Sequence, residues 1–122
     1  MLTLLVGIAG SAGAVSRVFV DGEVKRRLNA VLPWQTMLIN VTGAFIISLL
    51  AGLVTAKVAG PHWQTVLATG FCGGYTTFST ATVETLTLAR TGRGRAALGY
   101  AALSLVLALT ACAAGLGLGS LF

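Results

Sequence analysis

The chain alternates between long apolar runs and short segments that hold most of its charged side chains. Four apolar runs cover about residues 2–20, 34–56, 64–89 and 96–121. Each run reaches the roughly 20 residues that an α-helix needs to cross about 30 Å of hydrocarbon. The segments between the runs are too short to form a soluble domain. The pattern therefore predicts an all-α integral membrane protein, a single domain over residues 1–122 with four transmembrane helices.

The third run is the one that should not form a continuous lipid-facing helix. Its middle, residues 69–80, holds three glycines followed by a row of hydroxyl side chains. Glycine costs a helix about 1 kcal/mol relative to alanine, and threonine loses rotamer freedom there. Unwound backbone at membrane depth survives only where it is buried in protein or lines a polar cavity. We therefore expect a third helix broken at its centre, and such breaks commonly mark an ion or substrate site.

Composition and charge support a membrane protein and argue against other classes. Hydrophobic residues make up 56% of the 122 residues and charged residues 9%, against about 25% charged residues in a soluble domain. The net charge of +5 comes from basic residues that mostly lie between apolar runs. Such a pattern sets orientation in the membrane and does not form a face for nucleic acid. The first run lacks the basic start of a signal peptide, so we expect it to remain as a helix.

Small residues recur at four-residue spacing on three of the runs. Such faces let the backbones of membrane helices approach closely. The spacing fits packing within one chain and packing between two chains, and it does not separate them. The residues are Gly7 and Ser11 in the first run, Ala44, Ser48, Gly52 and Ala56 in the second, and Gly115 and Gly119 in the fourth.

Polar side chains within the runs are the candidate functional residues, because each is costly in a membrane unless it faces a partner or water. Arg17 has two equally good interpretations. It is either an anchor whose charge snorkels to the membrane surface, or part of a positively charged vestibule that attracts an anion. Thr36 and Asn40 lie one turn apart in the second run. Glu84 is the only carboxylate inside a run and shares a helix face with Thr80. Because a proton relay typically needs more than one such group, we expect a structural or water-organising role for Glu84.

Two further polar residues, Tyr100 and Ser104, are four residues apart in the fourth run. They fit a polar stripe along that helix. They fit equally well an interfacial tyrosine beside a serine that bonds to its own helix.

The motifs of three runs resemble one family. Residues 70–80 read Gly-Phe-Cys-Gly-Gly-Tyr-Thr-Thr-Phe-Ser-Thr and are followed by Glu84. This stretch resembles the third-helix signature of the small fluoride channels called Fluc or CrcB. Residues 13–17 (Gly-Ala-Val-Ser-Arg) are similar to the family's Gly-Ala-x-x-Arg, and residues 36–43 (Thr-Met-Leu-Ile-Asn-Val-Thr-Gly) to its Thr-x-x-x-Asn-x-x-Gly. The resemblance covers all four spans in order and spacing.

The resemblance implies a fluoride-selective channel, with no enzymatic activity, that exports fluoride passively across the plasma (inner) membrane and relieves fluoride toxicity. Such proteins are antiparallel dimers with two anion pores, each lined by both subunits. They hold a central structural Na⁺ on backbone carbonyls at the two helix breaks, and the matching positions here are Gly73 and Thr76. Carbonyls freed from helix bonding are hard oxygen donors suited to Na⁺.

The resemblance also implies an anion route. A pore for fluoride must replace water with close donors, and amide N–H, hydroxyl O–H and the positive edge of an aromatic ring can each do so. A narrow path of such donors discriminates by size and by the cost of dehydration. The matching positions are Asn40, Phe78, Ser79, Thr80, Tyr100 and Ser104, to which we add Thr36 and Arg17 as polar groups of the first two runs.

The sequence departs from the family pattern in ways that concern the partner subunit. The motif usually reads Thr-Thr-Phe-Ser-Thr-Phe, and this chain has Ala81 in place of the second ring. With Arg17, the side that carries residues 21–33 and 90–95 holds seven of the eight Lys and Arg, and the other side holds Lys57. Lys and Arg bias orientation toward the cytoplasm. We therefore predict a fixed orientation with both termini outside, and a related, oppositely oriented partner in preference to an identical one.

Two other classes stay open. A small proton-coupled multidrug exchanger also has four short helices, but it would need a carboxylate inside the first run, which has none before Asp21. A non-conducting membrane subunit that needs an oppositely oriented partner would explain the small-residue faces. It would not explain the costly break in the third helix.

Overall fold

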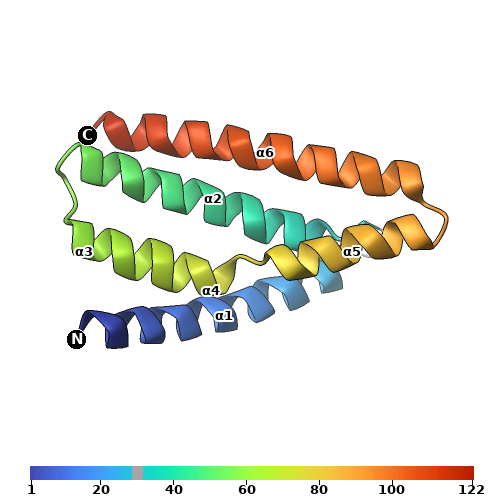
Figure 1. Cartoon of the computed structure of the whole chain (residues 1–122), viewed down its shortest axis with the longest axis horizontal. Coiled ribbons are helices and arrows are strands. Elements are labelled where there is room, and N and C mark those ends of the chain that lie inside the picture. The colour runs from blue at the N-terminus through green and yellow to red at the C-terminus, as the bar shows by residue number, and fades with distance from the viewer. Residues whose placement is uncertain (29–31) are drawn as a thin grey trace.

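The computed structural model describes residues 1–28 and 32–122, and all its regular elements are helices (Figure 1). α1, α2 and α6 are each long and apolar enough to cross a membrane. The remaining crossing, the third in chain order, is made of shorter segments. Successive crossings run in opposite directions, and both termini lie at one end of the bundle. The expected all-α fold with a broken third helix is confirmed. The elements are α1 (Leu2–Arg27), α2 (Trp34–Thr55), α3 (Pro61–Gln64), the π-helix η1 (Thr65–Cys72), α4 (Gly73–Tyr75), α5 (Phe78–Arg90) and α6 (Gly94–Ser120).

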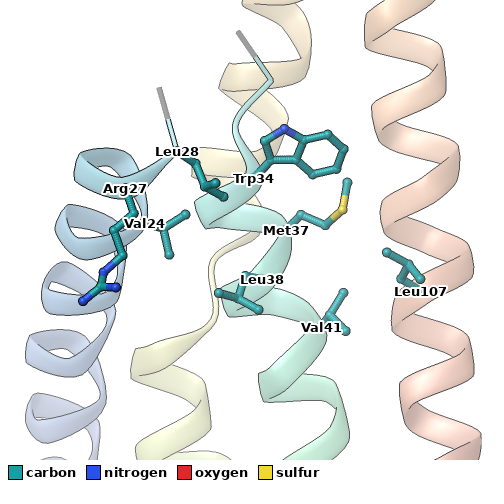
Figure 2. A pocket seen from close by; sticks show the side chains of 8 residues that line it. All are labelled: Val24, Arg27, Leu28, Trp34, Met37, Leu38, Val41 and Leu107. Carbon is teal, nitrogen blue, oxygen red and sulfur yellow. The ribbon is translucent and has the colours of Figure 1, made fainter. Parts of the chain in front are cut away.

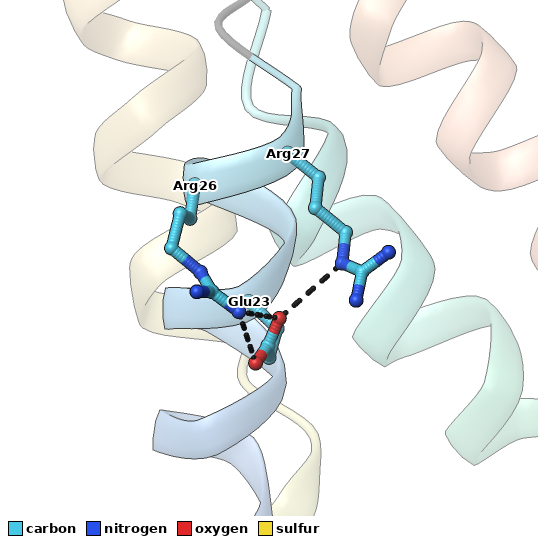
Figure 3. A network of polar contacts seen from close by, with 3 residues as sticks. All are labelled: Glu23, Arg26 and Arg27. Atoms are coloured by element: carbon cyan, nitrogen blue, oxygen red, sulfur yellow. Dashed lines mark hydrogen bonds and ion pairs between the residues drawn. The ribbon is translucent and has the colours of Figure 1, made fainter.

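α1 is longer than the sequence predicts. A loop was expected from Asp21, whereas the helix continues to Arg27. Ion pairs one turn apart hold this extension together, because Lys25 Nζ lies 3.1 Å from Asp21. Glu23 pairs with Arg26 at 2.6 Å and with Nε of Arg27 at 3.3 Å (Figure 3). Pairs at this spacing stabilise a helix, and basic side chains in its last turn interact favourably with the helix dipole.

The small-residue faces of α2 and α6 pack against each other within the chain. A Cβ built on Gly52 would lie 2.9 Å from Cα of Gly119, and a Cβ built on Gly119 would lie 2.5 Å from the carbonyl oxygen of Leu49. Ser48, which is 5% exposed, bonds back to the carbonyl oxygen of Ala44 at 2.9 Å and so brings no unpaired hydroxyl to the contact. For these two helices, the spacing of small residues serves packing inside one subunit.

The glycines of the third crossing serve close packing against α1. A Cβ built on Gly74 would collide with the carbonyl oxygen of Gly10, and one on Gly70 would lie 2.9 Å from Cβ of Ala9. Both glycines are helical, so they do not themselves interrupt the helix. The break comes after them, at residues 76–77, which lie between α4 and α5.

The α2–α6 contact predicts different effects for two glycines on the same helix. A Cβ at Gly115 would collide with Oγ of Ser48 and lie 2.6 Å from the carbonyl oxygen of Phe45, whereas a Cβ at Gly117 would meet no described atom within 4 Å. We expect Gly115→Ala to lower the free energy of unfolding by about 1–3 kcal/mol, because the contact becomes overpacked. Titration with SDS in mixed micelles measures this change.

Gly117→Ala is the matched control. It gains up to about 1 kcal/mol of helix propensity with no clash, so its unfolding transition should stay in place or rise. Equal transitions for the two variants would show that α2 and α6 are not packed as described.

Candidate functional site

The break in the third crossing is two residues of extended backbone. Thr76 has φ −81° and ψ 160°, and Thr77 has φ −149° and ψ 124°. Thr76 directly follows α4, and its hydroxyl donates to the carbonyl oxygen of Cys72 at 2.8 Å. The hydroxyl of Thr77 accepts from the backbone N–H of Thr80 at 3.2 Å and so caps the start of α5. The hydroxyls predicted to disfavour a helix therefore end one helix and begin the next.

The side chain of Asn40, on α2, forms hydrogen bonds to the backbone at the break. Its Nδ2 donates to the carbonyl oxygen of Thr77 at 2.9 Å, and its Oδ1 accepts from the N–H of Thr77 at 2.9 Å. Each unsatisfied backbone group in hydrocarbon costs several kcal/mol. A single amide therefore satisfies both backbone groups of the extended residue, and one N–H of Asn40 remains for another partner.

The same contacts release two carbonyl groups from helical bonding. In a continuous α-helix the carbonyl of Gly73 would accept from the N–H of Thr77, and that of Thr76 from the N–H of Thr80. The N–H of Thr77 is instead given to Asn40, and the N–H of Thr80 to the hydroxyl of Thr77. Gly73 is exposed, and a Cβ there would meet no described atom within 4 Å. These are the two carbonyls that the family resemblance implies for a cation, and carbonyl oxygens of this kind fit a hard ion such as Na⁺.

Side chains do not offer an alternative metal site in the described residues. No group of three or more His, Cys, Asp or Glu lies close enough together there to hold a metal ion.

A polar cavity of about 250 Å³ lies beside the break, between α1, α2 and α5. The hydroxyl of Thr36 donates to Oε1 of Glu84 at 2.9 Å, and Thr36 is 1% exposed. Oε2 of Glu84 is buried and has no hydrogen-bond partner in the described chain. Burying a carboxylate oxygen without a partner is costly, so Oε2 of Glu84 stands out among the polar atoms of this region. We call it the vestibule; it is lined by Arg17, Val18, Asp21, Lys25, Thr36, Ile39, Thr77, Thr80 and Glu84.

A second cavity, a groove of about 460 Å³, lies between α5 and α6. Phe78 lines it and is 85% exposed in the single chain. The hydroxyl of Tyr100 donates to the carbonyl oxygen of Pro33 at 3.1 Å, and Oγ of Ser104 is buried without a partner among the described residues. We call it the α5–α6 groove; it is lined by Phe78, Ala81, Thr82, Thr85, Leu86, Ala89, Tyr100, Ala101 and Ser104.

The predicted site residues therefore divide between three neighbouring places. Arg17, Thr36, Thr80 and Glu84 line the vestibule, and Phe78, Tyr100 and Ser104 line the α5–α6 groove. Asn40 lies at the break, and Oγ of Ser79 lies 3.4 Å from Oγ1 of Thr77. Their part in an anion route stays a prediction.

Sequence reasoning missed three polar residues of this region. Thr77 holds the break together, and Asp21 and Lys25 line the vestibule. Thr77 could have been found, because a threonine directly before an apolar helical run is a typical N-cap. Asp21 and Lys25 were placed in a loop, since the chain loses its apolar character there and gives no sign that α1 continues.

Comparison with known proteins covers nearly the whole chain. A family model described as CrcB-like protein, Camphor Resistance (CrcB), matches residues 4–116. A protein of Leifsonia xyli named fluoride-specific ion channel FluC 1 is 44% identical over 121 residues, which are 99% of this chain and 88% of that relative. A protein of the same name from Streptomyces avermitilis is 46% identical over 114 residues, 93% of this chain and 86% of the relative. Fluoride-specific ion channel FluC 2 of Bradyrhizobium diazoefficiens is 45% identical over 112 residues, 88% of this chain and 82% of the relative.

Proposed function

This chain belongs to the CrcB family, and from that premise we propose that it is a fluoride channel through which fluoride leaves the cell passively. It is a multi-pass protein of the cell membrane and a transporter rather than an enzyme. The observation that carries the proposal beyond family membership is the helix break held by Asn40. It brings the start of α5, with its unpaired backbone N–H groups, to a point where an uninterrupted helix would have every backbone group paired.

The start of α5 is suited to an anion. The first N–H groups of a helix have no partner within the helix, and the helix dipole places partial positive charge there. Phe78 and Ser79 stand in this first turn and are exposed, so a ring edge and a hydroxyl lie beside the unpaired N–H groups. Fluoride holds its water tightly, and these donors replace that water at close range.

The vestibule is the entrance to this route in our proposal. Arg17 lines it and attracts an anion from the basic end of the bundle, whereas Lys25, which also lines it, is paired with Asp21 at 3.1 Å. Glu84 would repel the same anion, but Thr36 donates to one of its oxygens and so holds the carboxylate against α2. This contact supports a structural and water-organising role for Glu84. From the break the route continues along Phe78 and the hydroxyls of the α5–α6 groove.

A structural Na⁺ is part of the same proposal. The carbonyls of Gly73 and Thr76 would hold it, because both are released from helical bonding at the break. When bound, the ion supplies a fixed positive charge at the centre of the membrane. The chain's own part is to keep the break in one conformation, which Asn40 and the hydroxyl of Thr77 do without the ion.

The single chain leaves this region open, which supports an antiparallel dimer. Gly73, Phe78, Ser79 and Thr80 are exposed, although they lie in the middle of the third crossing. Exposed polar groups at that depth are costly in lipid, so we infer that a second subunit covers them. Ala81 lines the α5–α6 groove where family members carry a ring, and a related partner subunit with its own ring would fill that space.

Phe78 gives the sharpest test of the anion route. We expect liposomes that hold the wild-type protein together with a related, oppositely oriented subunit to lose trapped fluoride rapidly, driven by voltage and without a proton gradient. Phe78→Ile should abolish this flux, because it removes the only ring that the motif still supplies. Phe19→Ile is the matched control, since Phe19 is also exposed at 69% but lies on α1 and lines neither the vestibule nor the α5–α6 groove; it should conduct at the wild-type rate.

The alternatives give other results in the same assay. Fluoride loss that requires a proton gradient would indicate an exchanger and contradict the channel. Wild-type flux through Phe78→Ile would exclude the ring edge from the route. If the chain alone is silent, flux that appears on adding a related subunit would support the need for a partner.

Orientation gives a second prediction. Figure 1 places the end of α1 and the α5–α6 turn, which carry six of the eight Lys and Arg, at the end of the bundle opposite both termini. We expect a single orientation with the termini outside, because Lys and Arg favour the cytoplasmic side. Reporter enzymes fused to the C-terminus, one active only outside and one only inside, measure this. Equal signals from both reporters would contradict a fixed orientation and favour a homodimer inserted both ways.

A further inference from the structure

An apolar groove opens between α1, α2 and α6 (Figure 2). No residue of the proposed anion route lines it. Its volume is about 450 Å³, within the range of small-molecule sites. The third crossing, which carries the exposed polar groups of the break, contributes no lining residue. We call it the interfacial groove; it is lined by Val24, Arg27, Leu28, Trp34, Met37, Leu38, Val41 and Leu107.

The interfacial groove runs from the membrane surface into the hydrocarbon. Arg27 is the last residue of α1 and Trp34 the first of α2, so both stand at the end of their crossings. Tryptophan is enriched at the depth of lipid head groups. Val41 lies seven residues further along α2, which places it about 10 Å deeper. The groove therefore follows the direction in which the acyl chain of a phospholipid lies.

One positive charge that lines the groove is only partly neutralised by its own helix. Lys25 pairs with Asp21 at 3.1 Å, and Arg26 pairs with both oxygens of Glu23 at 2.6 Å. Arg27 must share the same Glu23 carboxylate, which it reaches only through Nε at 3.3 Å (Figure 3). Two carboxylates face three cations, so the surplus positive charge falls on the guanidinium of Arg27. Among the described residues, Arg27 is also the only charged one that lines the groove.

We propose that the interfacial groove binds an anionic phospholipid, with one acyl chain along Leu38 and Val41 and the phosphate at Arg27. A neutral lipid would fill the apolar part equally well but would gain less at the guanidinium. A helix of a partner subunit would bury the guanidinium of Arg27, whose one ion pair is the shared contact to Glu23 at 3.3 Å, and burying a charge that is so weakly paired is costly. The proposal concerns a lipid site and does not depend on fluoride conduction.

Quenching of Trp34 fluorescence tests the proposal directly. Trp63→Phe leaves Trp34 as the only tryptophan, since the chain has two. The full-length protein is placed in phosphatidylcholine vesicles that contain phosphatidylglycerol or phosphatidylcholine with brominated acyl chains, at equal mole fraction. We expect brominated phosphatidylglycerol to bind about fivefold more tightly, the effect of one basic side chain near an anionic surface.

Three variants separate the groove from general attraction to the membrane. Arg27→Gln should make the two brominated lipids bind equally. Arg95→Gln is the matched control, because Arg95 is exposed near the start of α6 but does not line the groove; it should keep the fivefold preference. Val41→Phe fills the lower part of the groove and should weaken binding of both lipids.

Several outcomes would overturn the proposal. Equal quenching by the two lipids in the Trp63→Phe protein would show that the site does not select an anionic head group. A preference that survives Arg27→Gln would place the recognition elsewhere. Trp34 shielded from both brominated lipids would show that protein covers the groove.

Discussion

The pair of hydrogen bonds between Asn40 and Thr77 is the interaction on which the rest of this structure depends. An extended residue inside a membrane has a donor and an acceptor that water cannot reach, and leaving both unpaired costs several kcal/mol each. The amide of Asn40 has one donor and one acceptor in the orientation that satisfies both, at 2.9 Å each. Because Thr77 is satisfied in this way, the third crossing can stop at α4 and restart at α5. The start of α5 and the carbonyls of Gly73 and Thr76 thereby become available in the middle of the protein.

Helix packing within the chain supports the break and leaves one region for a partner. Gly52 and Gly119 let α2 and α6 approach closely, and Gly74 does the same for the third crossing against α1. These contacts hold α2, and with it Asn40, at a fixed distance from Thr77. The exposed ring of Phe78 and the hydroxyl of Ser79 are not covered by any of these contacts in the described chain. In our proposal, a second subunit at this place shields them from lipid and completes a path for an anion.

The sequence predicted the elements well and their contacts less well, for physical reasons. The four crossings follow from the length of the apolar runs, and the break from the row of hydroxyls. The place of the break was harder, because Gly70 and Gly74 lower helix propensity and yet stay helical. Their purpose depends on α1, which the local sequence does not show. The continuation of α1 to Arg27 was missed because ion pairs, and not apolar residues, stabilise its last turns.

The candidate residues were identified because polar side chains are costly inside a membrane. Their geometry could not be derived from the sequence. Asn40 was expected as a donor to the anion, and the structure shows that one of its N–H groups and its oxygen hold the backbone of Thr77. Thr36 and Glu84 are 48 residues apart in the sequence. Only the packing of α2 against α5 brings them close enough to form their hydrogen bond. The division of the polar residues between the vestibule and the α5–α6 groove likewise follows from tertiary structure alone.

Fluoride efflux through Asn40→Asp tests the central claim most directly. Aspartate keeps an acceptor for the N–H of Thr77 but loses the donor to its carbonyl, and it places negative charge beside the proposed anion route. We expect protein that still elutes in its folded, assembled form to lose at least about tenfold in flux, because the break loses one hydrogen bond and the route gains a negative charge. Thr55→Val, which removes a hydroxyl bonded only to its own helix, should conduct at the wild-type rate. Wild-type flux through Asn40→Asp would contradict the account.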